Sequence, residues 1–154
     1  MSRANNSPSV SHFANTLNTK GRIAAHYEAM EFRKAAAETR AIWAAGNEYL
    51  TRAAPWVKFK TDRAAAAVGV RTGLNLVALF ARIAQPLIPA TAARLLDALQ
   101  IPDADRSWPD PDRFEGLDLL PEGHPISPPP VLFMKLEDAT VADWSDQFGG
   151  APAD

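Results

Sequence analysis

The indole of Trp56 is the side chain whose type and surroundings could do chemistry most directly. It follows Pro55, at the point where a run of helix-forming residues stops. Four cations lie close to it in the sequence: Arg52, Lys58, Lys60 and Arg63. An exposed aromatic ring stacks on an unpaired nucleobase, and neighbouring cations bind the phosphates. A tryptophan after a helix-ending proline is also typical of a side chain that fills a core, so both interpretations stay open at this point.

Catalytic and metal-binding motifs are missing from the sequence. No phosphate-binding glycine loop, dinucleotide fingerprint, serine-nucleophile elbow or zinc-protease helix occurs. The three histidines are scattered, which is typical of surface or capping positions: His12, His26 and His124. Four aspartates lie in a proline-rich stretch that lacks the glycine and the final glutamate of a calcium loop: Asp103, Asp105, Asp110 and Asp112. We therefore predict no catalytic residue, no metal site and no cofactor in this chain.

The composition predicts one globular domain. The chain has 154 residues, of which 47% are hydrophobic and 22% are charged, enough for a core of ordinary size. The absence of cysteine excludes disulfides and thiolate metal sites. The N-terminal residues show no apolar stretch typical of a secretory signal, and no eighteen consecutive residues are apolar. These features predict a cytoplasmic protein with no membrane partner.

Charge is distributed unevenly between the two halves of the chain. Residues 1–71 contain eleven Lys and Arg against five Asp and Glu, whereas residues 72–154 contain five against thirteen. The first half therefore carries a net charge of +6 and the second −8. This split favours a basic face and an acidic tail, although two solvated surfaces that differ by chance would give the same counts.

The hydrophobic pattern predicts an all-α fold. Apolar residues recur at three- and four-residue steps in four segments, for which we expect helices at 9–29, 31–53, 62–85 and 90–100. In the second segment the expected apolar stripe is Phe32, Ala36, Trp43, Gly46 and Leu50. Short connections make successive helices neighbours. We therefore expect an antiparallel helical bundle whose third helix is the most buried.

The connection between the second and third helices has clear boundary signals. Pro55 is expected to end the second helix, because proline lacks the backbone donor and restricts the residue before it. Asp62 is expected to cap the third helix. Between them, Lys58 and Lys60 are expected to alternate outward from Val57 and Phe59.

The chain after Ile101 is rich in proline and aspartate, so we expect a mostly irregular segment over 101–138. Three apolar side chains are expected to hold it against the bundle: Trp108, Phe114 and Leu117. The apolar run 131–138 is expected to lie extended along a groove, and a last short helix is expected near 141–147. With a flexible stretch at 1–8 and a tail at 139–154, the helical domain would cover residues 9–138.

A spaced set of residues within 32–60 resembles one known family. The set is Phe32, Asn47, Tyr49, Pro55, Trp56 and Lys60. Downstream, the proline pair of 86–89 precedes an amphipathic helix, and Trp108 is followed by the segments 123–126 and 132–137. This order resembles the C-terminal helical anticodon-binding domain of methionyl-tRNA synthetase, and the agreement covers roughly residues 25–138.

The resemblance implies roles for particular residues. Trp56 would stack on an anticodon base, a contact typically worth about 1–3 kcal/mol. Salt-dependent phosphate contacts would come from Arg52, Lys58, Lys60 and Arg63. Structural roles fall to the remaining matched positions: Phe32, Asn47, Tyr49 and Pro55. Trp43, on the apolar stripe, is expected in the core.

Two features depart from the family pattern. The His-x-Gly-His and Lys-Met-Ser-Lys-Ser signatures of the family's catalytic domain are absent. This chain alone is therefore not expected to be an enzyme, and ATP and methionine would bind only the absent catalytic domain. An asparagine and an arginine in the family's first helix also contact the anticodon, whereas here Asn15, Asn18 and Arg22 do not follow that pattern. We therefore expect anticodon reading to be partial.

Three functions remain to be compared. The leading hypothesis is a tRNA-binding module that serves methionyl-tRNA aminoacylation, selective for the CAU anticodon and working as a fragment or with a separate catalytic synthetase chain. The alternative is a degenerate stand-alone bundle that acts as a protein-interaction scaffold without RNA specificity. A helical domain from another synthetase of the same class is disfavoured by the spacing of Asn47, Tyr49, Pro55 and Trp56.

Overall fold

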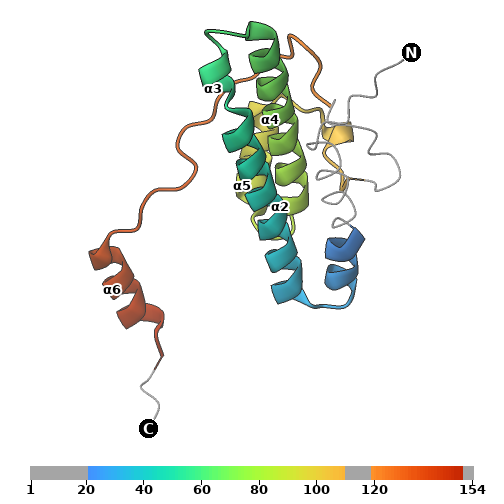
Figure 1. Ribbon diagram of the computed structural model, residues 1–154. Coiled ribbons are helices and arrows are strands. Elements are labelled where there is room, and N and C mark those ends of the chain that lie inside the picture. The colour runs from blue at the N-terminus through green and yellow to red at the C-terminus, as the bar shows by residue number, and fades with distance from the viewer. Residues whose placement is uncertain (1–20, 110–118, 151–154) are drawn as a thin grey trace.

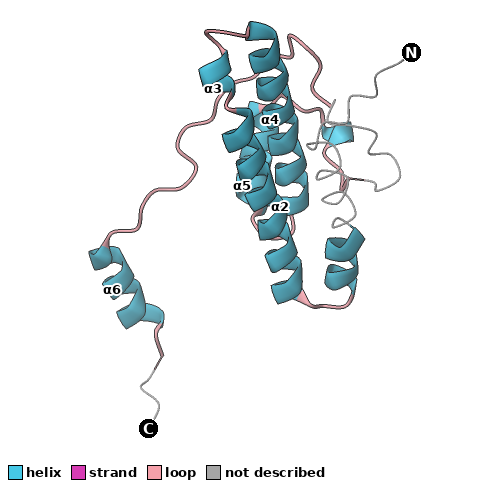
Figure 2. Ribbon diagram, in the orientation of Figure 1, coloured by secondary structure: helices cyan, strands magenta, loops and turns pink. Residues whose placement is uncertain are grey.

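The computed structural model describes residues 21–109 and 119–150 (Figure 1). Several expectations fall outside these residues: the flexible stretch 1–8, the first half of the first helix, the roles of His12, Asn15 and Asn18, the aspartates Asp110 and Asp112, and the packing of Phe114 and Leu117. Within the described part every regular element is a helix, as Figure 2 shows, so the fold class is all-α.

In the described residues seven helical segments follow one another, and two of them, one α-helix and one 3-10 turn, are short. Residues 21–28 form a helix that is followed by α2 (Phe32–Ala53), the short α3 (Pro55–Lys58) and α4 (Arg63–Ala84). Next come α5 (Pro89–Ala98), a 3-10 turn at Asp103–Asp105 and α6 (Asp138–Phe148). In Figure 1, α2, α4 and α5 lie side by side as an antiparallel bundle, whereas α6 lies away from it. The observed α2, α4 and α5 begin and end within two residues of the helices expected at 31–53, 62–85 and 90–100.

The α4 helix is the centre of the bundle, because it is buried on two faces. One face packs with α5 and the chain beyond it, in a cluster that includes Ala78, Leu96 and Leu120. The other face packs with α2 and the helix 21–28, in a cluster that includes Ile42 and Ile83. The length and mean hydropathy of α4 are also sufficient for a membrane span. The core helix of a soluble protein meets the same two criteria, so they are weak evidence for a span.

The buried stripe of α2 differs from the expected one. Its buried residues are Ala35, Thr39, Ile42 and Gly46, whereas Phe32 is 56% exposed and Trp43 is only partly buried. Small residues face α4 because the two helices approach closely: a Cβ on Gly46 would lie 2.8 Å from Cε2 of Phe80. Larger apolar side chains lie beside this contact. The spacing of apolar residues alone does not show which of them face α4 and which lie beside it.

A short helix that the sequence did not predict follows α2. The backbone of Ala54 is left-handed, with φ 41°, and its N–H donates to the carbonyl of Leu50 at 2.9 Å, which ends α2. Pro55 then begins α3, because the first helical position needs no backbone donor. The expected alternation is therefore wrong: Val57 and Phe59 lie on a helical turn and are 63% and 56% exposed.

The C-terminal chain separates into two parts. Trp108 packs edge-on against Tyr27, with ring centroids 6.1 Å apart, and Leu120 is buried, so Trp108 and the segment 120–127 both lie on the bundle. The expectation that 131–138 lies along a groove is wrong, because Val131, Phe133 and Met134 are 79%, 66% and 85% exposed. This stretch leads away from the bundle to α6 (Figure 1).

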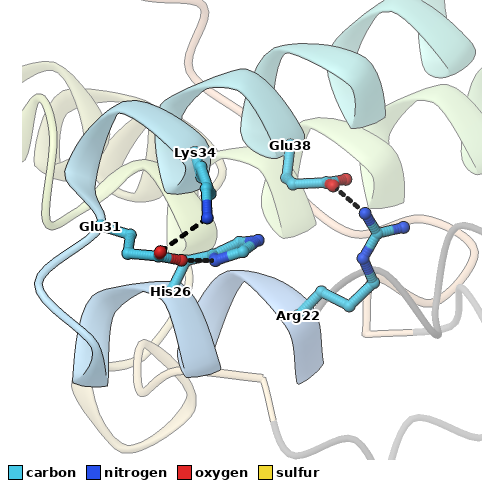
Figure 3. A network of polar contacts seen from close by, with 5 residues as sticks. All are labelled: Arg22, His26, Glu31, Lys34 and Glu38. Carbon is cyan, nitrogen blue, oxygen red and sulfur yellow. Dashed lines mark hydrogen bonds and ion pairs between the residues drawn. The ribbon is translucent and has the colours of Figure 1, made fainter.

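A polar network joins the helix 21–28 to the start of α2 (Figure 3). The carboxylate of Glu31 lies 2.8 Å from Nδ1 of His26 and accepts a hydrogen bond from Nζ of Lys34 at 2.6 Å. A second ion pair joins Arg22 to Glu38. The network spans a tight turn in which Met30 has a φ of 57°. Side chains on both sides of the turn therefore hold the two helices together.

The network predicts a specific pH dependence of stability. The hydrogen bond from Lys34, followed by that from His26, lowers the pKa of Glu31 below its ordinary value of 4.5. A lowered carboxylate pKa stabilises the folded state above pH 4.5, and this contribution is lost as the pH falls below that value. We expect Glu31→Gln to lower the melting temperature at neutral pH, and the difference from wild type to shrink towards about pH 3.

Thermal unfolding followed by circular dichroism at several pH values would measure this difference. Glu28→Gln removes one exposed carboxylate close to the same turn and serves as the control for the change in net charge. A Glu31→Gln difference that stays constant across the acidic range would contradict the assigned role of the network.

Candidate nucleic-acid interface

An open groove with a volume of about 870 Å³ lies between the α3–α4 corner and the C-terminal chain. One side is formed by Trp56, Phe59 and Arg63, together with the first turns of α4. The opposite side is formed by the segment from Leu120 to Ile126, which includes His124. The lining is mostly apolar, and its charged members are Arg63, Arg71 and Glu122. This is the character expected of a surface that holds flat aromatic groups attached to phosphates.

The backbone around Trp56 holds the indole outward. The ring of Pro55 is buried against α4, where Gly69 leaves room for it: a Cβ on Gly69 would lie 3.2 Å from Cβ of Pro55. The next turn is closed by Val57, whose N–H donates to the carbonyl of Ala54 at 3.0 Å. Trp56 itself is 63% exposed. The interpretation of this tryptophan as a core-filling side chain is therefore wrong, because Pro55 takes the buried position.

The predicted cations lie on one corner of the molecule but do not all face the groove. Arg63 lines it, with its guanidinium carbon 4.9 Å from the centre of the Phe59 ring. Arg52 lies on the last turn of α2, 3.6 Å from the carboxylate of Glu48. Lys58 and Lys60 are exposed and have no ion-pair partner in the described part of the chain. Contact of these side chains with RNA stays a prediction.

The positions that were assigned structural roles are spread over α2 and α3. Pro55 lies in the groove lining, Tyr49 is partly buried, and Asn47 is exposed on α2. Phe32 lies at the other end of α2, where its ring centroid is 6.3 Å from that of Tyr27. Arg22 also lies at that end, where it pairs with Glu38. Glu38 is roughly 25 Å from Trp56 along the axis of α2. The structure therefore does not bring Arg22 to the groove.

The far wall of the groove depends on a buried asparagine that sequence reasoning missed. Asn75 on α4 is 2% exposed and binds the backbone of Leu120 from both sides. Its Oδ1 accepts a hydrogen bond from the Leu120 N–H at 2.8 Å, and its Nδ2 donates to the Leu120 carbonyl at 3.3 Å. Nε of Arg71 donates to the same carbonyl at 3.1 Å. The only available signal was one amide within the otherwise apolar run 73–81 of α4.

A second attachment holds the other end of this wall. Nε2 of His124 lies 2.7 Å from the carbonyl of Leu99, and because a carbonyl only accepts, this nitrogen carries the proton. The N–H of Ser127 donates to the carbonyl of Ala98 at 2.7 Å. The segment 120–127 is therefore fixed to α4 at its start and to the end of α5 at its end. His124 has a structural partner, in line with the capping role expected for the histidines.

No group of three potential metal ligands occurs among residues 21–109 and 119–150. The expectations of no metal site and no cofactor stay predictions for the whole chain. The described residues offer an apolar groove, two exposed aromatic rings and nearby cations, an arrangement that suits the binding of a ligand.

A helical bundle that presents an exposed tryptophan and cations beside such a groove is the class of fold expected of a helical anticodon-binding domain. The profile of one family, described as the anticodon binding domain of methionyl tRNA ligase, matches residues 4–153. The chain belongs to this family, which confirms the resemblance drawn from the set Phe32, Asn47, Tyr49, Pro55, Trp56 and Lys60.

Relatives from bacteria agree with this assignment. The chain is 64% identical over 135 residues to the methionine–tRNA ligase of Maricaulis maris and 62% identical over 133 residues to that of Hyphomonas neptunium, with 84% of the chain covered in both cases. Identity to the methionine–tRNA ligase of Streptomyces avermitilis is 41% over 127 residues, or 82% of the chain. The matched region spans 22–23% of the length of these relatives.

The attachment through Asn75 predicts a large effect of one substitution. In Asn75→Ala, the N–H of Leu120 loses its partner in a buried place, so we expect the free energy of unfolding to fall by about 1–3 kcal/mol. Gln147→Ala on the exposed α6 is the matched control, with an expected change within about 0.5 kcal/mol. Urea unfolding followed by circular dichroism measures both, and equal stabilities of the two variants would contradict the role of Asn75.

Proposed function

We propose that this chain binds the anticodon loop of a tRNA with a CAU anticodon through the surface around Trp56, and so supports methionyl-tRNA aminoacylation. The main support for this proposal is the position of the indole, which is 63% exposed on a turn that Pro55 and Gly69 hold in place. Sequence-specific recognition of RNA uses such rings, because unpaired loop bases stack on them while their edges are read by hydrogen bonds. The family membership of the chain supports the same ligand.

The proposed energetics divide between the ring and the cations. Stacking on Trp56 supplies about 1–3 kcal/mol. Lys58, Lys60, Arg63 and, more distantly, Arg52 supply phosphate contacts, which weaken as salt rises because counterions are released on binding. The exposed ammonium groups of Lys58 and Lys60 suit this role, since no carboxylate neutralises them within the described residues.

Ligase chemistry is assigned to a part of the protein outside the matched region. The relatives are named methionine–tRNA ligases, and this chain corresponds to less than a quarter of their length. We infer that ATP and methionine bind a catalytic part, in the same polypeptide or in a partner chain, and that the present residues contribute affinity and selectivity for tRNA. The proposed place of action is the cytoplasm, where such a ligase would serve translation.

A protein-interaction scaffold is the second candidate. It is favoured by the exposed apolar side chains of the C-terminal part: Val131, Phe133, Met134, Leu136, Val141, Trp144 and Phe148. Exposed apolar surface of this extent is typical of a protein contact. The two functions differ in their ligand, because only the first requires RNA binding that depends on Trp56.

The proposed function predicts that binding is selective for the anticodon. The full chain should bind a tRNA with a CAU anticodon more tightly than the same tRNA with a changed anticodon, by roughly 5- to 150-fold if one base contact is lost, because such a contact contributes on the order of 1–3 kcal/mol. Titration by fluorescence anisotropy at physiological salt measures both dissociation constants. Equal affinities would argue decisively against selective reading.

Removal of the indole is the second prediction. Trp56→Ala should weaken binding of the CAU tRNA by roughly 5- to 150-fold, the loss of one stacking contact, and should leave the helical content unchanged because the ring is exposed. Trp144→Ala removes an equally large ring from α6 and is the matched control, which should bind as the wild type does. An unchanged dissociation constant for Trp56→Ala would overturn the proposed interface.

A further inference from the structure

Phe59 is a second exposed aromatic ring on the same turn as Trp56. It is 56% exposed and lines the same groove. Its N–H donates to the carbonyl of Pro55 at 2.9 Å, so the helical geometry of α3 continues through it. Residues three apart on a helical turn lie on one side, with Cβ atoms about 5–6 Å apart. The two rings are therefore neighbours on one face of a rigid corner.

Arg63 lies over the ring of Phe59, with its guanidinium carbon 4.9 Å from the ring centre. The position of Arg63 is fixed because it is the first residue of α4, and Asp62 caps this helix by accepting a hydrogen bond from the N–H of Ala65 at 3.0 Å. The Asp62 carboxylate occupies the helix N-terminus, so the anion-binding capacity of this corner comes from side-chain cations. The planar guanidinium covers one side of the ring, and both side chains remain open towards the groove.

The spacing of the two rings suits successive unstacked nucleotides. Stacked nucleotides rise about 3.4 Å per step along one strand. Rings whose Cβ atoms are about 5–6 Å apart would therefore hold two bases that are separated from each other, which is the state of bases splayed from an RNA loop. Arginine guanidinium planes stack on bases in the same way as aromatic rings do. Folding alone gives no reason to expose Phe59, since its ring is left outside both apolar clusters of the core.

We propose that Phe59 and Arg63 form a second stacking platform, which takes the base next to the one held by Trp56 on a single-stranded RNA loop. This inference rests on the proposed function, because it names a further contact of the same surface. It gives Arg63 a role that depends on the shape of its guanidinium plane, whereas a phosphate contact depends on its charge alone.

Protein variants paired with altered tRNAs test the platform. Anisotropy titrations of the full chain would use the CAU tRNA and a series of altered tRNAs. Each altered tRNA has a single abasic nucleotide, at a different position of the anticodon loop. Phe59→Leu keeps an apolar side chain and removes the ring, Phe59→Trp keeps a ring, and Arg63→Lys keeps the charge and removes the plane. Far-ultraviolet circular dichroism of each variant checks that helical content is unchanged.

We expect Phe59→Leu to weaken binding of the intact tRNA by roughly 5- to 150-fold, and Phe59→Trp to restore it. Arg63→Lys should also weaken binding. One abasic tRNA should bind Phe59→Leu and the wild type equally well, because it lacks the base that stacks on Phe59. A different abasic tRNA should bind Trp56→Ala and the wild type equally well. The two missing bases should be neighbours in the anticodon loop. This pattern identifies which base lies on which ring.

Other results would overturn the platform. Wild-type affinity of Phe59→Leu, or a loss of equal size with every abasic tRNA, would show that no base stacks on this ring. Full affinity of Arg63→Lys would show that Arg63 acts only as a charge. These outcomes leave the contact of Trp56 intact, whereas absence of tRNA binding by the wild-type chain would overturn the proposed function itself.

Discussion

Two hydrogen bonds from one side-chain amide decide where the C-terminal chain lies. Asn75, within the otherwise apolar run 73–81 of α4, satisfies both the N–H and the carbonyl of Leu120, 45 residues away. A proline-rich segment has few backbone donors with which to form regular structure, so it needs such an external partner to be held in one place. Once Leu120 is fixed, its side chain completes the core cluster shared by α4 and α5. The residues that follow then become the wall opposite Trp56.

Close packing at the other side of the bundle fixes the position of the aromatic corner. The helices α2 and α4 approach through Gly46, and the turn after α2 reaches α4 through the contact of Pro55 with Gly69. Since interiors are packed as densely as crystals, these contacts leave Pro55 one place to lie. Trp56 and Phe59 follow from that placement, because their backbone belongs to the same short helix. The rings of Trp56 and Phe59 are therefore exposed because Pro55 is buried against α4.

The sequence predicted the elements whose signals are local and repeated. The helices α2, α4 and α5 have long apolar periodicities with clear boundaries, and Asp62 caps α4 as expected. It did not predict α3, because Pro55 was interpreted as the end of one helix and is also the beginning of the next. Asn75 was missed because its partners are 45 residues away, and a single chain carries no local sign of that contact. The exposed run 131–136 was expected to be packed because its composition is apolar, yet no described surface of the bundle covers it.

Attachment of the groove wall through main-chain atoms has an evolutionary consequence. Asn75 and Arg71 bind the peptide group of Leu120, and the second anchor near the end of α5 includes the peptide N–H of Ser127. Apart from His124, whose Nε2 donates to the carbonyl of Leu99, side chains between these anchors such as Glu122 and Ile126 are exposed and do not fix the path of the loop. Mutation can therefore alter what the loop presents to a ligand while its path stays the same, which gives the domain a surface on which new preferences can arise at little cost to folding.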